Sequence, residues 1–219
     1  MRDIRAIVFD FDGVIVDSEA SHFLALQDTM VAAGWPLSGT EYGERYLGYS
    51  DRDTFAAVSD DRGLRLTPAD IDRLAAEKGR RYEQRASAGP VLFPDAADCI
   101  RGLAQTFPLA IASGSLRHEI ATVLDLHGLS ALFAAIVGAD NVSAGKPHPA
   151  PYLEAARQLN VPPALCAAIE DSPWGLESAR AAGMFAIGVT HSYPAARLPA
   201  ADAIVTSLRD VAELLHRLR

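Results

Sequence analysis

The sequence contains very little cysteine, which argues against a small fold held together by disulfides. Cys99 and Cys166 are the only cysteines among 219 residues, and their spacing matches no metal-ligand pattern. Cys166 opens the apolar run of residues 166–169, so we expect it to be a core residue. The hydrophobic fraction of 49% is ample for a substantial core.

Long apolar runs and an excess of positive charge are lacking too. No apolar run approaches the roughly 18 residues of a membrane helix, and the first residues show no signal-peptide pattern. We therefore expect a protein of the reducing cytoplasm with no membrane partner. The formal net charge of -8 argues against nucleic acid as the main partner. The net charge does not exclude a small phosphorylated metabolite as the partner, because a local lysine, arginine or Mg²⁺ would decide its binding.

Strand and helix patterns alternate along most of the chain. Short apolar runs predict strands at residues 4–9, 109–112, 133–137, 167–169, 186–189 and 203–205. Helical patterns follow at residues 94–105, 117–127, 151–159, 173–182 and 208–218. Such alternation predicts an α/β fold, with a doubly wound, Rossmann-like parallel sheet and helices on both faces.

Residues 17–87 interrupt this alternation. Residues 18–33 have apolar side chains at helical spacing and are followed by Gly34. The sequence after Gly34 is strongly charged. Ile71 and Leu74 are among the periodic apolar positions there, and no strand pattern is present. We predict a small all-helical domain at 17–87, inserted after the first strand into a core domain of residues 1–16 and 88–219.

The first predicted strand ends in two aspartates, Asp10 and Asp12, with Gly13 directly after them. Carboxyl ends of parallel strands are where open α/β sheets usually bind ligands. Carboxylates this close repel each other unless a cation lies between them, and a hard ion such as Mg²⁺ would remove the repulsion. Taken alone, two such aspartates are equally typical of an ordinary loop or a helix cap.

Polar residues also follow three later predicted strands. Ser113 comes first, with Gly114 and Ser115; Lys146 lies in a loop; Glu170 and Asp171 end the fourth strand. Each alone has a plainer explanation: a turn serine, a solvated lysine, or acidic residues stabilising a helix N-terminus. Together, at one sheet edge, they suit a phosphoryl group with Mg²⁺. One aspartate is placed for in-line attack and the other for proton transfer.

These residues resemble the motifs of the haloacid dehalogenase-like hydrolase superfamily, in the subgroup of capped small phosphatases and phosphomutases related to β-phosphoglucomutase. Residues 10–19 look like its first motif and Ser113 like its second. Residues 146–149 with Tyr152 resemble the third. Residues 170–172, with Gly175 and residues 182–184, resemble the fourth. The resemblance spans nearly the whole chain.

The resemblance implies a role for each matching residue. Asp10 would be the nucleophile, forming an aspartyl-phosphate, and Asp12 the general acid/base; Ser113 and Lys146 would bind the transferring phosphoryl group. The implied Mg²⁺ ligands are Asp10, Glu170, Asp171 and the backbone carbonyl of Asp12. The presence of Asp12 speaks against dehalogenation, because the dehalogenases of the superfamily lack it. The inserted domain would be a mobile cap that closes over substrate.

Cap residues are expected to set substrate specificity. The residues we expect at the substrate site are Gly13, His22, Gly48, Arg52, Lys78, Gly114, Ser115 and Arg117. A mutase needs cations for a second phosphate, yet Asp51 stands where mutases tend to have arginine and Leu116 where they have lysine. Hydrolysis of a small phosphomonoester, such as a sugar phosphate, is therefore favoured over mutase chemistry. The remaining alternative is a non-catalytic metabolite-binding module; we expect a monomer or weak dimer.

Overall fold

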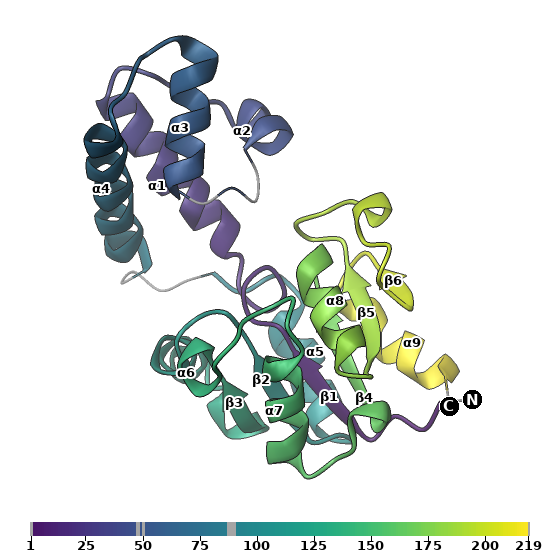
Figure 1. Cartoon of the computed structure of the whole chain (residues 1–219). Coiled ribbons are helices and arrows are strands. Elements are labelled where there is room, and N and C mark those ends of the chain that lie inside the picture. Colours follow the sequence, from purple (N-terminus) through teal and green to yellow (C-terminus); the bar gives the residue numbers. More distant parts are fainter. Residues whose placement is uncertain (1, 47–48, 50, 87–90, 219) are drawn as a thin grey trace. The chain divides into compact units, whose positions relative to one another are not determined.

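The computed structural model describes residues 2–46, 49, 51–86 and 91–218, and it divides into two compact units. Residues 1–17 and 91–219 form the sheet unit, and residues 18–90 form the helical unit (Figure 1). The predicted domain boundaries lie at 16/17 and 87/88, close to this division; that the helical unit acts as a cap stays a prediction.

The described residues of the sheet unit form six parallel strands in the order β3-β2-β1-β4-β5-β6. The strands are β1 (Ala6–Phe9), β2 (Leu109–Ala112), β3 (Phe133–Val137), β4 (Cys166–Glu170), β5 (Phe185–Val189) and β6 (Ala203–Val205). Residues of β1, β2, β4 and β5 are all buried, which explains why these strands read as continuous apolar runs rather than alternating ones. The register places the ends of β1, β2 and β4 side by side.

Helices cover both faces of this sheet (Figure 1). They are α5 (Ala96–Ala104), α6 (Arg117–Leu126), α7 (Ala150–Leu159), α8 (Pro173–Ala181) and α9 (Arg209–Leu218). Ile7 and Phe9 of β1 point to one core, which α5, α6 and α9 cover. Ala6 and Val8 point to the other, which α7 and α8 cover. The predicted doubly wound α/β fold is confirmed, and Cys166 is a buried core residue as expected.

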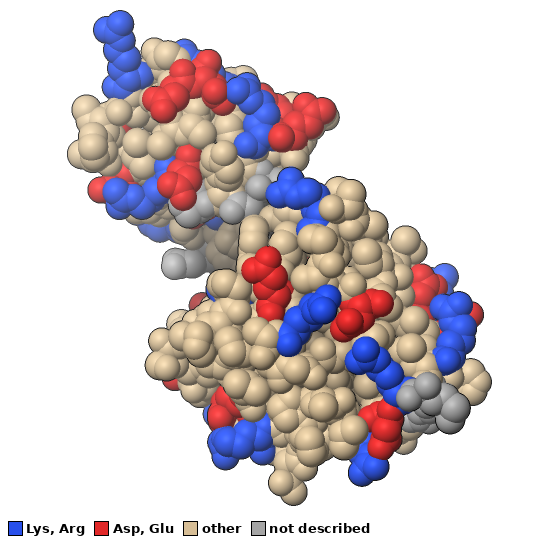
Figure 2. Space-filling model, turned by 45° about the vertical axis from the view of Figure 1, so that its right-hand side comes forward, with Lys and Arg blue, Asp and Glu red and all other residues tan. Residues whose placement is uncertain are grey.

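In the part of the chain that the structure describes, four short 3-10 helices join these elements, at Ser130–Leu132, Ala139–Asn141, Pro163–Leu165 and Ala195–Arg197. The two ends of the unit meet, since the Arg2 N–H donates to the Leu218 carbonyl at 2.8 Å. Among the described residues, no helix is both long enough and apolar enough to cross a bilayer. Acidic and basic side chains are interspersed on the face shown in Figure 2.

The helical unit contains α1 (Ser18–Ala32), α2 (Gly39–Arg45), α3 (Asp51–Arg62) and α4 (Pro68–Ala86). Its described residues include no strand, as predicted. A small apolar cluster holds it together, formed by Leu26, Met30, Leu37, Tyr46, Phe55, Val58 and Leu74. The cluster takes one or two side chains from each of α1, α3 and α4, so these helices bury their apolar stripes against one another.

Candidate active site

Asp10 directly follows β1, at the edge of the sheet where parallel strands end. Its N–H donates to the Ile169 carbonyl of β4 at 2.9 Å, so the backbone pairing with β4 continues to this residue. Gly13 then turns the chain with φ of +78°, and a Cβ there would overlap the carboxylate of Asp171. Glycine is therefore required twice over, for its backbone conformation and for the space it leaves.

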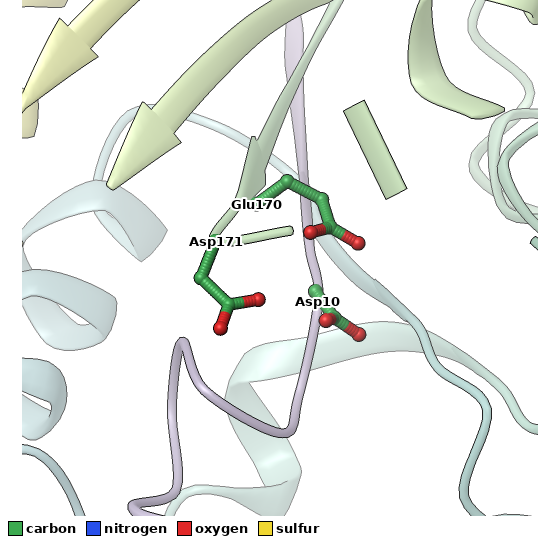
Figure 3. Close-up of side chains that lie close together, drawn as sticks. All are labelled: Asp10, Glu170 and Asp171. Atoms are coloured by element: carbon green, nitrogen blue, oxygen red, sulfur yellow. The ribbon is translucent and has the colours of Figure 1, made fainter. Parts of the chain in front are cut away.

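Three buried carboxylates meet at this edge: Asp10 from the end of β1, and Glu170 and Asp171 from the end of β4 (Figure 3). One ligand atom from each lies within 4.8 Å of the others. Glu170 is held on one side by Ser172, whose N–H and Oγ donate to Oε2 at 2.8 and 2.9 Å. Gly175 of α8 makes room for Glu170, because a Cβ there would overlap the glutamate carboxylate.

Lys146 joins this cluster from the loop after β3. Its Nζ lies 2.7 Å from Asp10 Oδ1 and 2.6 Å from Glu170 Oε1. The buried Tyr152 of α7 flanks the lysine, and its hydroxyl donates to Glu170 Oε1 at 3.3 Å. Burial works against the charge on Lys146, but the carboxylates of Asp10 and Glu170 outweigh burial and raise the lysine pKa above its usual range.

Three carboxylates face Lys146, so the cluster would hold excess buried negative charge if all three were ionised. Burial raises the pKa of Asp10 above its ordinary value, with the charges of Glu170 and Asp171 adding to the rise. Burial and the charge of Glu170 raise the pKa of Asp171 to about 7. A divalent cation would remove this penalty, and a set of carboxylate oxygens is the donor set that hard ions such as Mg²⁺ take. The residues present therefore fit a metal ion.

A serine turn lies at the end of β2. Ser113 is buried, and its Oγ accepts from the Ser115 N–H at 2.9 Å. Ser115 in turn donates from its hydroxyl to Asp12 Oδ2 at 2.5 Å, which ties the turn after β2 to the loop after β1. The Asp12 side chain is thus held by Ser115, and it is not one of the three carboxylates that form the cluster. Arg117 opens α6 with an exposed side chain, while its N–H donates to Asp140 Oδ1.

The family model described as haloacid dehalogenase-like hydrolase matches residues 4–183, which include the ends of β1, β2 and β4. The chain belongs to this family. It is 30% identical to phosphoglycolate phosphatase of Escherichia coli strain K12, over 96% of this chain and 92% of the relative. It is 31% identical to β-phosphoglucomutase of Bacillus subtilis, over 97% and 94%.

The fold agrees with solved structures of the same family. A haloacid dehalogenase family hydrolase from Deinococcus radiodurans, solved with phosphate and sodium, superposes with a TM-score of 0.85 at 28% identity. That match covers 99% of this chain and 97% of the other. The recognition of a haloacid dehalogenase-like hydrolase from sequence motifs is thereby confirmed, and the chain is an enzyme of this superfamily.

The residues predicted for the cap side of the site lie in the helical unit. Lys78 of α4 is almost fully buried; its Nζ lies 2.8 Å from Asp51 Oδ1 and 2.5 Å from His22 Nδ1. The His22 ring stacks on Tyr82 at 4.0 Å. Arg52 pairs with Asp72 at the surface; Gly48 lies outside the described residues. Their part in substrate binding stays a prediction.

Two residues at the site were missed by sequence reasoning: His191 and Ser192, in the loop after β5. The Ser192 hydroxyl donates to Asp171 Oδ2, and His191 Nδ1 lies 3.0 Å from the Gly13 carbonyl oxygen. A signal was present, because polar residues follow β5 at the same sheet edge as they follow β1, β2 and β4. The rule used for those strands would have found them.

Proposed function

We propose that this enzyme is a Mg²⁺-dependent phosphatase that hydrolyses a small phosphomonoester through an aspartyl-phosphate on Asp10. One observation carries the proposal: the Asp10 carboxylate is buried at the strand end, in direct contact with Lys146 and beside Glu170 and Asp171. A carboxylate in such a position is typical of a nucleophile held next to a cation site.

The carboxylates of Asp10, Glu170 and Asp171 are our choice of metal ligands, with the backbone carbonyl of Asp12 as a further one. Their oxygen-only donor set and excess negative charge suit Mg²⁺. Bound there, the ion would supply positive charge to the transferring phosphoryl group. Lys146 adds a fixed positive charge beside Asp10, which both orients the nucleophile and attracts the phosphoryl oxygens.

The chemistry proceeds in two displacements at phosphorus. In the first, an Asp10 oxygen forms a bond to phosphorus, the ester P–O bond breaks, and Asp12 gives its proton to the departing alcohol oxygen. In the second, Asp12 takes a proton from water as the water oxygen attacks phosphorus, and the bond to Asp10 breaks to release inorganic phosphate. The Ser113 hydroxyl and the backbone N–H of Gly114 are proposed to hold the phosphoryl oxygens. Ser115, whose N–H donates to Ser113 Oγ, is proposed to hold the turn in place beside the substrate.

Simple hydrolysis fits the helical unit better than phosphosugar mutase chemistry. A mutase has to hold a second phosphate, and Lys78 and Arg52 are each already paired with a carboxylate, Asp51 and Asp72. Leu116, where mutases tend to have lysine, offers no charge. The similarity to a relative named phosphoglycolate phosphatase supports the phosphatase. The similarity to a relative named β-phosphoglucomutase makes the mutase the second candidate function.

A small phosphorylated metabolite is therefore the partner we propose, rather than nucleic acid or a membrane surface. The net charge of -8 and the interspersed charges of Figure 2 support this choice, since anionic polymers bind surfaces with gathered positive charge. Action as a monomer or weak dimer in the cytoplasm remains part of the same prediction.

The test is a phosphate-release screen of the purified chain with Mg²⁺. The panel contains phosphoglycolate, sugar phosphates, nucleotides and an aryl phosphate. We expect release from one or a few of them, abolished by Asp10→Asn and by EDTA. Asp3→Asn is the matched control, because Asp3 is exposed and pairs with Arg5, which is exposed too. This control variant should retain full activity.

Release from no member of the panel would contradict the phosphatase. Interconversion of β-glucose 1-phosphate and glucose 6-phosphate would then be measured, and turnover there would establish the mutase. Activity that survives Asp10→Asn unchanged would remove Asp10 from the role of nucleophile. Metabolite binding without any turnover would favour the non-catalytic binding module.

A further inference from the structure

The loop after β5 contacts two separate parts of the candidate metal site. From this loop, Ser192 donates its hydroxyl hydrogen to Asp171 Oδ2. The neighbouring His191 places Nδ1 at 3.0 Å from the Gly13 carbonyl. A carbonyl oxygen can only accept, so Nδ1 of this histidine carries the hydrogen. Both bonds join segments far apart in sequence, by 21 and 178 residues.

The His191 ring anchors this loop. It is half-buried and stacks on Phe93, with ring centroids 3.9 Å apart and an angle of 20° between the planes. Phe93 is itself fixed, since its N–H donates to the Ile15 carbonyl at 3.0 Å. The histidine is therefore held by its ring face and by Nδ1 at once, so the adjacent Ser192 has a defined position.

Asp171 needs such a restraint more than its neighbours do. Glu170 is fixed by Ser172 and Lys146, and Asp10 is fixed by Lys146. Asp171 is fixed by neither Ser172 nor Lys146. One of its carboxylate oxygens is turned towards Asp10 (Figure 3). The carboxylate lies against Gly13, in the place that a Cβ would take, so no side chain at position 13 can bond to it. Ser192 is the side chain whose hydrogen bond resists rotation about the Cβ–Cγ bond.

We propose that Ser192 is a positioning residue for Asp171, and that its hydroxyl sets the affinity of the site for a divalent cation. This inference rests on the metal site of the proposed function. Hydrogen-bonding partners of metal ligands orient those ligands, and their loss typically weakens metal binding by about 10–100-fold. The ordinary alternative is that Ser192 is a turn residue whose hydroxyl has no effect on the ion.

The experiment measures cation binding directly, without substrate, by the electron paramagnetic resonance of free Mn²⁺ titrated with the full chain. Ser192→Ala should raise the Mn²⁺ dissociation constant about 10-fold, at the low end of the usual effect. Ser192→Thr keeps the hydroxyl and should restore binding to within about 2-fold. Competition of Mg²⁺ with Mn²⁺ should rank the cation affinities of the wild type, Ser192→Thr and Ser192→Ala in the same order.

Ser130→Ala is the matched control. Its hydroxyl also donates to a carboxylate, Asp125 Oδ1 at 2.5 Å, but at the surface near the end of α6. This variant should bind Mn²⁺ like the wild type. Circular dichroism of each metal-free variant verifies that it is folded, so weak binding cannot be blamed on unfolding.

Equal Mn²⁺ affinity in Ser192→Ala and the wild type would overturn the inference. Weak binding in both Ser192→Ala and Ser192→Thr would overturn it too, because packing rather than the hydroxyl would then be responsible. Absence of Mn²⁺ binding in the wild type would remove the metal site itself. A 10-fold effect in a protein that releases no phosphate would support Ser192 while contradicting the proposed phosphatase, so the two failures are distinguishable.

Discussion

Gly175 shows how closely the chain approaches the candidate metal ligands. It lies in the first turn of α8, where a Cβ would overlap the buried carboxylate of Glu170. We expect Gly175→Ala to displace Glu170, to lower the free energy of unfolding by about 1–3 kcal/mol, and to weaken cation binding. Urea unfolding and Mn²⁺ titration would measure the two effects.

The matched control is Gly102→Ala in α5, where a Cβ would meet nothing within 4 Å. Alanine is the better helix former, so this variant should be unchanged or more stable by up to about 1 kcal/mol. Equal stability losses in both variants would mean that the effect comes from the helix backbone, and that Glu170 is not displaced.

The raised pKa of Asp171 predicts how the free energy of unfolding of the metal-free protein depends on pH. Its pKa is raised from 3.8 to about 7 by burial and by Glu170. Such a group stabilises the fold below its unfolded value, and this contribution is lost as pH rises through the folded value. In EDTA, the unfolding free energy of the wild type should therefore fall relative to Asp171→Asn between about pH 4 and 7, by on the order of 2–4 kcal/mol.

Urea unfolding at a series of pH values would measure this difference. Asp3→Asn is the control, because the pKa of Asp3 is lowered by its hydrogen bond to Arg5, so its effect lies below this window. Excess Mg²⁺ should abolish the fall, since the ion takes the place of the proton. Parallel curves for the wild type and Asp171→Asn would show that Asp171 titrates normally.

Most site residues could be predicted because their signal is local. Asp10 follows an apolar run that ends abruptly, and the pair Glu170 and Asp171 follows another, and that pattern alone marks a strand end at the sheet edge. The bond between Ser192 and Asp171 has no local signature, because it depends on how β4 and β5 pair. Likewise, the fit of Glu170 against Gly175 is a matter of three-dimensional packing.

At the scale of the elements, the ends of helices and strands in the sheet unit agree with the sequence patterns to within about two residues. The ends could be predicted because apolar residues recur at regular spacing within these elements and glycines or prolines flank them. The four 3-10 helices were not predicted, since three residues contain too little periodicity. Bounds of α2, α3 and α4 were not predicted either, because charged residues dominate that part of the sequence.

Lys78 ties three helices of the helical unit together. Its buried Nζ joins α4 to Asp51 at the start of α3 and to His22 of α1. Lys78→Met should lower the unfolding free energy by about 1–3 kcal/mol, because Asp51 loses a desolvated partner. The measurement is chemical denaturation followed by circular dichroism, with the unit kept in the full chain.

Arg52→Met provides the comparison for Lys78→Met. Arg52 pairs with Asp72, but both side chains are more than half exposed. An exposed pair of this kind contributes little, so we expect a change within about 0.5 kcal/mol. A loss as large as that of Lys78→Met would mean that burial does not distinguish the two ion pairs.

At the scale of the whole molecule, the two units differ in how much apolar surface they bury. Among the described residues, the sheet unit has a core on each face of its sheet, whereas the helical unit has one smaller cluster. Regions with fewer buried apolar contacts open at lower free energy. We expect amides of α3 and α4 to exchange hydrogen through openings roughly 1–3 kcal/mol below those of β1 and β4.

Native-state hydrogen exchange, followed by mass spectrometry at low denaturant concentrations, would measure both free energies. The proposed cation ligands all belong to the sheet unit, so Mg²⁺ at about 100 times its dissociation constant should stabilise β1 and β4 by about 2.7 kcal/mol. The same Mg²⁺ should leave α3 and α4 unchanged, because their local opening does not release the ion. An equal rise of the opening free energy in both units would show that the chain opens as one cooperative body. The small apolar cluster would then not limit the protection of the helical unit against hydrogen exchange.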